Sequence, residues 1–122
     1  MPGEKILIVD DEPLICSALS RELRGAGYNV DSVFSGEEAL EAVKQKSYSL
    51  MLIDKNMPCM NGIEACGRIK KICSDLIAIF ITGEHAMREA EMEAAGGRVC
   101  LYKPFAQGEV KEQIKKALSE KK

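Results

Sequence analysis

The chain has no tryptophan, a single histidine and only 5% aromatic residues. Its five cysteines form no CxxC pair, and their odd number argues against a complete disulfide framework. We therefore expect the cysteines to be buried and to act as small apolar side chains. The net charge of −2 provides no positive excess for direct nucleic acid binding. No apolar run is long enough to span a bilayer and the N-terminus lacks a signal-peptide pattern, so we expect a cytoplasmic protein without membrane association.

The remaining composition is that of an ordinary globular protein, with 46% hydrophobic and 30% charged residues. A length of 122 residues suits one domain and leaves no room for a second. We therefore expect a single domain over residues 1–122, with a core over about residues 5–118.

Short apolar segments alternate with segments of helical periodicity. We predict strands over residues 5–9, 29–34, 50–54, 78–82 and 99–102. We predict helices over about residues 13–25, 35–43, 61–73, 84–95 and 107–118. Ser35 and Glu38 have the spacing of a capping box at the start of the second helix.

The predicted helix over residues 84–95 is only weakly amphipathic. Its most apolar face consists of Ala86, Ala90 and Ala94, which we expect to be buried. Because alanines bury little surface, this helix should be the least firmly docked of the five.

The regular alternation predicts an α/β fold built from βαβ units, with one five-stranded parallel sheet covered on both faces. In a flavodoxin-like (βα)5 doubly wound sheet of strand order 2-1-3-4-5, ligands bind beyond the carboxyl ends of the adjacent first and third strands. Asp10 and Asp11 would face Asp54 at that point. The fourth and fifth strands would bring Thr82 and Lys103 to the same edge.

Three carboxylates in one pocket repel each other, so either their pKa values rise or a cation joins them. Mg²⁺ prefers hard oxygen ligands and shares its sites with phosphate. A carboxylate is a competent nucleophile, and phosphoryl transfer depends mainly on positioning and on stabilising three equatorial oxygens. We therefore predict that Asp54 accepts a phosphoryl group whose oxygens contact Mg²⁺, Lys103 and the Thr82 hydroxyl. Gly83, without a side chain, would leave space for the phosphodonor.

Four motifs follow one another in a specific order: Ile-Leu-Ile-Val-Asp-Asp-Glu-Pro at residues 6–13, Leu-Ile-Asp-Lys-Asn-Met-Pro-Cys-Met-Asn-Gly at 52–62, Ile-Thr-Gly at 81–83 and Lys-Pro-Phe at 103–105. Together they resemble the response-regulator (CheY-like) receiver domains of two-component signal transduction, from Lys5 to about Leu118. The resemblance implies a phosphorylation-activated switch that takes its phosphoryl group from a histidine kinase phosphohistidine or a small donor such as acetyl phosphate. It implies a phosphoprotein that assists its own phosphorylation and dephosphorylation rather than a turnover enzyme.

The resemblance also implies a metal site. Asp11, Asp54 and the backbone carbonyl of Asn56 would bind Mg²⁺, and Asp10 would act mainly through water. The peptide bond before Pro104 is usually cis in such domains.

Two positions depart from the usual receiver pattern. The aromatic residue that commonly accompanies the threonine in switching is replaced by Cys100. Tyr102 lies two residues on, hence on the same strand face, and either substitutes in the switch or is an ordinary half-buried tyrosine. Lys55 follows the acceptor where an apolar residue is more common, and strand alternation points it away from Asp54, which favours a solvent-facing or loop role.

Phosphorylation would act by population shift, with partners that recognise the helix over residues 84–95, the strand over 99–102 and the last helix. The implied partners are a sensor histidine kinase or phosphotransfer protein and an output domain or downstream protein. A homodimer through the same surface is a further expectation.

Three other functions compete with a phosphorylated switch. A flavin mononucleotide site would need a hydroxyl- and glycine-rich loop where the acidic segment 10–12 stands. A haloacid-dehalogenase-like phosphatase would need an acid at position 56, which is Asn56. A phosphorylation-independent pseudo-receiver, acting only in protein interaction, stays open, although such domains commonly lose an acid or the lysine that this chain keeps.

Overall fold

Strands and helices alternate along the chain as predicted. The computed structural model describes residues 3–83, 88–106 and 108–120. The elements are β1 (Lys5–Val9), α1 (Pro13–Gly25), β2 (Asn29–Val33), α2 (Gly36–Gln45), β3 (Leu50–Asp54), α3 (Gly62–Ile72), β4 (Ile77–Thr82), α4 (Glu89–Ala94), β5 (Gly97–Tyr102) and α5 (Glu109–Glu120).

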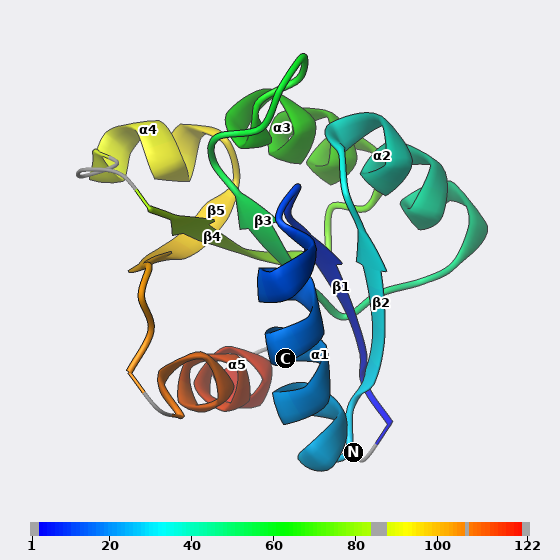
Figure 1. Ribbon diagram of the computed structural model, residues 1–122. Helices are drawn as coiled ribbons and strands as arrows, with labels where there is room; N and C mark the ends of the chain where they lie inside the picture. The colour runs from blue at the N-terminus through cyan, green and yellow to red at the C-terminus, as the bar shows by residue number, and fades with distance from the viewer. Residues whose placement is uncertain (1–2, 84–87, 107, 121–122) are drawn as a thin grey trace.

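The strands form one parallel sheet in the order β2-β1-β3-β4-β5, which confirms the predicted flavodoxin-like topology. Helices α1 and α5 cover one face of the sheet, and α2, α3 and α4 cover the other (Figure 1). The central strands are therefore enclosed on both sides, which explains their continuous apolar sequences.

Each face of the sheet has its own apolar core. On the α1/α5 face, Ile8, Leu52 and Ile79 pack with Leu23 and Ile114. The neighbouring residues in the same strands point to the opposite face, where they pack against helices α2, α3 and α4. Phe80 lies on that face and is the largest fully buried side chain. No helix in the described ranges is long and apolar enough to cross a membrane.

Three strand boundaries differ from the prediction. β2 ends at Val33, so Phe34 lies outside it and is exposed. β4 begins one residue earlier than predicted, at Ile77, which pairs with Leu50. β5 begins at Gly97, because this glycine fits against the Phe80 ring, where an added Cβ would lie 2.6 Å from ring carbons.

The predicted buried face of the fourth helix is wrong where the structure describes it. Ala90 and Ala94 are exposed, whereas Met92 and Ala95 are buried. Residues 84–87, including Ala86, lie outside the described residues. The long Met92 side chain offers more apolar surface than an alanine, so it determines which side of α4 faces the sheet.

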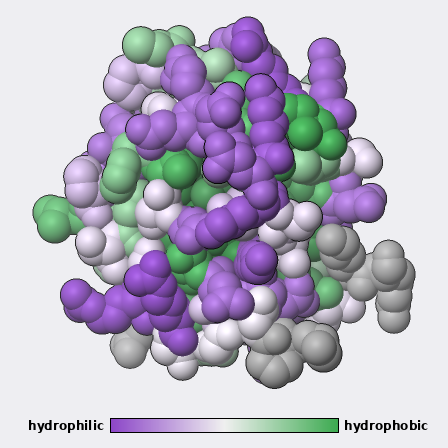
Figure 2. All heavy atoms as spheres, turned by 90° about the vertical axis from the view of Figure 1, so that its right-hand side faces the viewer, coloured by the Kyte–Doolittle hydropathy of each residue, from purple (hydrophilic) through white to green (hydrophobic). Residues whose placement is uncertain are grey.

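The edge strand β2 is covered by the segment that follows α2. Asp31 accepts a hydrogen bond of 2.6 Å from the Tyr48 hydroxyl and pairs at 3.1 Å with Lys46 Nζ. The Tyr48 hydrogen bond is the main reason that the pKa of Asp31 lies below its usual range. The surrounding face, which carries β2 and α2, is mainly hydrophilic with smaller apolar areas (Figure 2). Charged and polar groups here protect an exposed sheet edge from pairing with another chain.

The loop between β3 and α3 approaches its own base closely at Gly62. The Gly62 N–H donates a 2.8 Å hydrogen bond to the Lys55 carbonyl, and an added Cβ would lie 2.1 Å from the Asp54 carbonyl oxygen. Asn61 caps α3 by accepting a hydrogen bond from the Glu64 N–H at 2.9 Å. Gly62 therefore allows the loop to close behind Asp54.

Replacing Tyr48 with phenylalanine should lower the free energy of unfolding by about 1 kcal/mol at pH 7, because it removes a partly exposed hydrogen bond to a carboxylate. Since the folded-state pKa of Asp31 is below its ordinary 3.8, this stabilisation is present above pH 3.8 and lost as the pH falls through the lower folded value. Urea unfolding of both proteins at several pH values measures the difference. Tyr28→Phe is the control. Its difference in free energy of unfolding from the unmodified protein should not shrink as the pH falls.

Replacing Gly62 with alanine should cost about 3 kcal/mol of folding free energy, because backbone rather than a flexible side chain must move to admit the methyl group. Gly67 lies inside α3 with nothing within 4 Å of an added Cβ, which makes Gly67→Ala the matched control. That control should gain about 0.5–1 kcal/mol from higher helix propensity. Equal denaturation midpoints for the two variants would contradict the close-approach argument.

Candidate functional site

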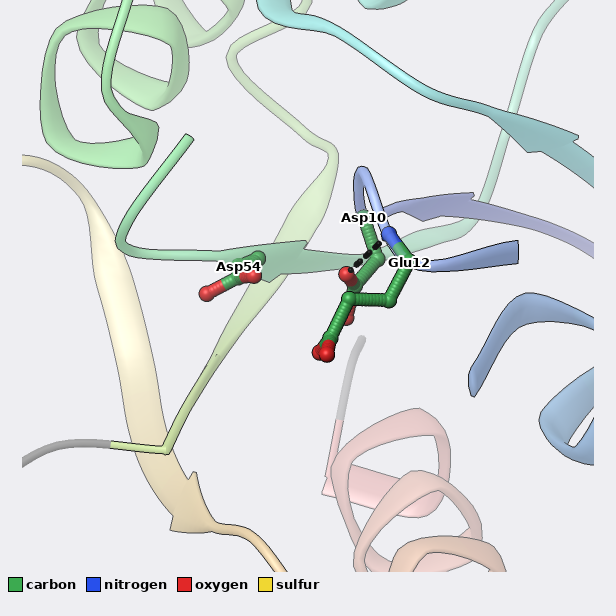
Figure 3. A group of neighbouring side chains, drawn as sticks. All are labelled: Asp10, Glu12 and Asp54. Carbon is green, nitrogen blue, oxygen red and sulfur yellow. Dashed lines mark hydrogen bonds between the residues drawn. The ribbon is translucent and has the colours of Figure 1, made fainter. Parts of the chain in front are cut away.

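The site lies where β1 and β3 end side by side. Val9 pairs with Ile53 in the sheet register, so the next residues, Asp10 directly after β1 and Asp54 at the last position of β3, lie side by side. Carboxylate oxygens of Asp10, Glu12 and Asp54 lie within 4.8 Å of one another (Figure 3). The backbone N–H of Glu12 donates to Asp10 Oδ1 at 2.9 Å, which fixes the turn after β1.

Lys103 brings a positive charge into this group from the end of β5. Its Nζ lies 2.7 Å from Glu12 Oε1, 2.9 Å from Asp10 Oδ2 and 3.4 Å from Asp54 Oδ2. The Lys103 N–H donates to the Thr82 carbonyl at 2.8 Å, and the following peptide bond to Pro104 is cis, as the resemblance implies. The lysine thus contacts three carboxylates from two segments of the chain.

Burial and charge set the protonation of these groups. Burial, together with the negative charge of Asp10, raises the pKa of Asp54 to about 6, although a hydrogen bond from the Asn56 N–H and the charge of Lys103 oppose the rise. Burial lowers the pKa of Lys103, but contacts with Glu12 and Asp10 outweigh it and raise this pKa well above the usual range. At neutral pH the site therefore combines an ionised lysine with a predominantly ionised Asp54.

Thr82 and Asn56 form the side of the site next to Asp54. Thr82 is fully buried at the end of β4, and its Oγ1 lies 3.4 Å from the Asn56 side-chain nitrogen. Asp54 Oδ1 accepts a 3.1 Å hydrogen bond from the Asn56 N–H. Gly83 follows Thr82, and the one atom of the described residues that an added Cβ there would meet is Lys103 Cδ, at an ordinary 3.8 Å.

The acidic group differs in membership from the one proposed on sequence. The structure brings Asp10 and Asp54 together with Glu12, while Asp11 is exposed and lies outside this close group. Glu12 was not among the residues that the sequence predicted for the site. Its place at the end of the acidic segment after β1 is the signal that could have identified it. Which side chain of that segment turns toward Asp54 depends on the conformation of the turn, which strand periodicity does not describe.

The two departures from the receiver pattern lie on the α4 side of the site. Cys100 is half-buried against the core beneath α4, and Tyr102, paired in register with Thr82, is 42% exposed. Lys55 points away from the carboxylates, as predicted. It is not simply solvent-facing, however, because its Nζ lies 3.8 Å from Glu91 Oε1 on α4.

The donor chemistry of the acidic group fits a divalent cation. Three carboxylates with one ammonium leave net negative charge in a small volume, and all the acidic donors are hard oxygen atoms. Acids at an edge can exist without a metal, but two of these are buried, where an uncompensated charge is costly. The group can therefore hold an ion such as Mg²⁺.

Comparison with known proteins gives the same family throughout. The family model described as the response regulator receiver domain matches residues 6–115. The chain is 38% identical over 116 residues to the transcriptional regulatory protein ZraR of Salmonella typhimurium, covering 93% of this chain and 26% of ZraR. The chain therefore spans about a quarter of that relative.

Solved structures match over nearly the whole chain. A CheY-like receiver domain protein from Methanospirillum hungatei superimposes with a TM-score of 0.93 at 28% identity, covering 98% of this chain and 96% of that one. The response regulator TrrA from Thermotoga maritima, in complex with Mg²⁺-BeF, gives a TM-score of 0.83 at 37% identity, covering 93% and 97%. With its sheet order and the motifs after β1, β3, β4 and β5, the chain belongs to the response regulator receiver domains of two-component systems.

Proposed function

We propose that this receiver domain is a phosphorylation-activated switch whose phosphoryl acceptor is Asp54. The observation that carries the proposal is the contact of one lysine, Lys103, with the buried Asp54 and Asp10 and the exposed Glu12. Buried ion pairs are often no more stabilising than well-packed apolar side chains of similar volume, because removing charges from water costs free energy. Stabilising the sheet edge alone would therefore not favour such a group. A site for an incoming phosphoryl group explains why both signs of charge are kept there.

The chain supplies the nucleophile and much of the electrostatic environment. An Asp54 carboxylate oxygen attacks phosphorus as the bond to the donor nitrogen or oxygen breaks, which forms an acyl phosphate and releases the donor's leaving group. The Asn56 N–H holds the carboxylate in place by its hydrogen bond to Oδ1. Lys103 Nζ, 3.4 Å from Oδ2, stabilises negative charge on one phosphoryl oxygen, and the Thr82 hydroxyl donates to another.

Mg²⁺ is the cofactor that we propose. When bound, it would neutralise charge on the phosphoryl oxygens and on the acidic group. Asp54, Asp11 and the Asn56 carbonyl are the proposed direct ligands, with Asp10 acting through water. Glu12, which lies close to Asp10 and Asp54, is an additional candidate.

The signal would leave the site through the elements that follow it. We propose that Thr82 moves toward the phosphoryl group and that β5, with Cys100 and Tyr102, changes together with α4 and α5. We propose as partners a sensor histidine kinase or phosphotransfer protein and an output domain or downstream protein, with homodimerisation through the α4–β5–α5 surface. A cytoplasmic location and a single receiver domain over residues 1–122 complete the proposal.

Mass spectrometry tests whether Asp54 is the phosphoryl acceptor. Intact mass after incubation with Mg²⁺ and acetyl phosphate should show a single phosphoryl adduct. Asp54→Ala and addition of EDTA should each abolish it, because one removes the nucleophile and the other the metal. Asp11→Ala and Glu12→Ala, compared under the same conditions, decide which acid is the more important ligand.

Asp75 lies outside the acidic group, so Asp75→Ala should keep the full adduct and serves as the surface control. Absence of an adduct on the unmodified protein, with phosphoramidate as well, would favour the phosphorylation-independent interaction module instead.

Hydrogen exchange tests the proposed conformational change in α4, β5 and α5. Hydrogen exchange should change on phosphorylation in α4, β5 and α5, and Tyr102→Ala should reduce that change, since Tyr102 is the aromatic side chain in register with Thr82. Phe34→Ala is the matched control, because Phe34 is similarly exposed, at 45%, but follows the opposite edge strand. An unaltered response in the Tyr102 variant would make this residue an ordinary surface tyrosine.

A further inference from the structure

Lys55 connects the loop after Asp54 to helix α4. Its Nζ lies 3.8 Å from Glu91 Oε1, and the two side chains are 22% and 37% exposed. Among the described residues, the other ion pairs outside the acidic group join side chains that are at least 42% exposed. Being more buried than these, the Lys55–Glu91 pair is less screened by solvent and salt.

The base of the Lys55 side chain is held rigidly. Its N–H donates to the Ile81 carbonyl at 2.9 Å, and its carbonyl accepts from the Gly62 N–H at 2.8 Å. Its side chain follows those of Met51 and Ile53 in strand alternation, on the face of the sheet that α4 covers. A change in the backbone after Asp54 would therefore be transmitted to the ammonium group facing α4.

Helix α4 is the shortest helix among the described residues. It spans only Glu89–Ala94, and Met92 is its one buried side chain. A helix of six residues is not stable by itself, so its position depends on contacts with the rest of the domain. Glu89, Glu91 and Glu93 give α4 three negative charges, and its last turn has no basic residue. The positive charge of Lys55 is paired with one of the three, Glu91.

We propose that the Lys55–Glu91 ion pair is a restraint that holds α4 beside the β3–α3 loop in the arrangement seen here, and that losing it favours the phosphorylated arrangement. The second part rests on the proposed function. Any movement of α4 away from the loop separates the two charges, so the pair stabilises the present state relative to the state in which α4 has moved. The Lys55 ammonium pairs with Glu91 rather than with the acidic group, and the two side chains act as positioning residues.

Hydrogen exchange of the α4 amides tests the restraint without phosphorylation. Lys55→Met and Glu91→Gln should each speed exchange of the Met92 and Ala95 amides by about two- to fivefold, the range for one partly buried ion pair. The double variant should exchange no faster than either single one, because only one interaction is lost. Arg68→Met, which breaks the Arg68–Glu64 pair on α3, is the control and should leave α4 unchanged.

The rate of phosphorylation by acetyl phosphate tests the link to activation. Both single variants should take up the phosphoryl group about two- to fivefold faster, since each releases α4 by the same interaction. A simple effect of charge on the anionic donor would act differently, with Lys55→Met slower and Glu91→Gln faster. Rates that move in opposite directions would therefore overturn the link to activation.

The two measurements separate the possible failures. Unchanged α4 exchange in both single variants overturns the restraint, whatever the phosphorylation rates are. If the unmodified protein forms no adduct at Asp54, the proposed function fails and the link to activation fails with it. The exchange data still decide whether the pair holds α4.

Discussion

Repulsion among buried carboxylates is the constraint on which the rest of this domain depends. Asp10 is fully buried and Asp54 nearly so, a few ångströms apart, and each accepts one main-chain hydrogen bond, from the Glu12 and Asn56 N–H groups. Lys103 supplies the opposite charge, and removing it would leave buried anions unpaired, at a cost of several kcal/mol. The fifth strand must therefore end at the same edge of the sheet as the first and third, with β4 between β3 and β5.

The same charges explain why the site suits a switch. One lysine does not neutralise all of the negative charge in this group. A bound cation or an added phosphoryl group therefore changes the electrostatic interactions of the site strongly. Asn56 contacts both Asp54 and Thr82, and Lys103 joins Thr82 by its backbone and the acids by its side chain. A change in charge at Asp54 thus has short structural routes to the ends of β4 and β5.

Stability is distributed unevenly around this site. The strands carry two fully buried cores, whereas α4 is short and buries one side chain. Elements with few buried contacts open and shift at the lowest free energy, and regulatory movements use them for that reason. A single ion pair such as Lys55–Glu91 has little effect on global stability, but we propose that it adds to the packing of Met92 and Ala95 in positioning α4.

The sequence by itself determined the fold class, the strand order and most of the site. The alternation of apolar strands with amphipathic helices admits few other topologies, and Asp10, Asp54, Thr82 and Lys103 all end or follow strands, where a parallel sheet must bring them to one edge. The cap at Ser35 was equally predictable, and the Glu38 backbone N–H does donate a 3.1 Å hydrogen bond to Ser35 Oγ.

Tertiary structure alone decided the features that depend on side-chain direction and on contacts between distant elements. Glu12 rather than Asp11 lies against Asp10 and Asp54, because the turn after β1 sets the direction of each side chain. Met92 faces the sheet in place of the alanines because it fills the space over Gly97, and Lys55 meets Glu91, 36 positions away, because the sheet places α4 beside its loop. Periodicity specifies which face of an element is apolar, but not which particular neighbour a polar side chain on the other face will find.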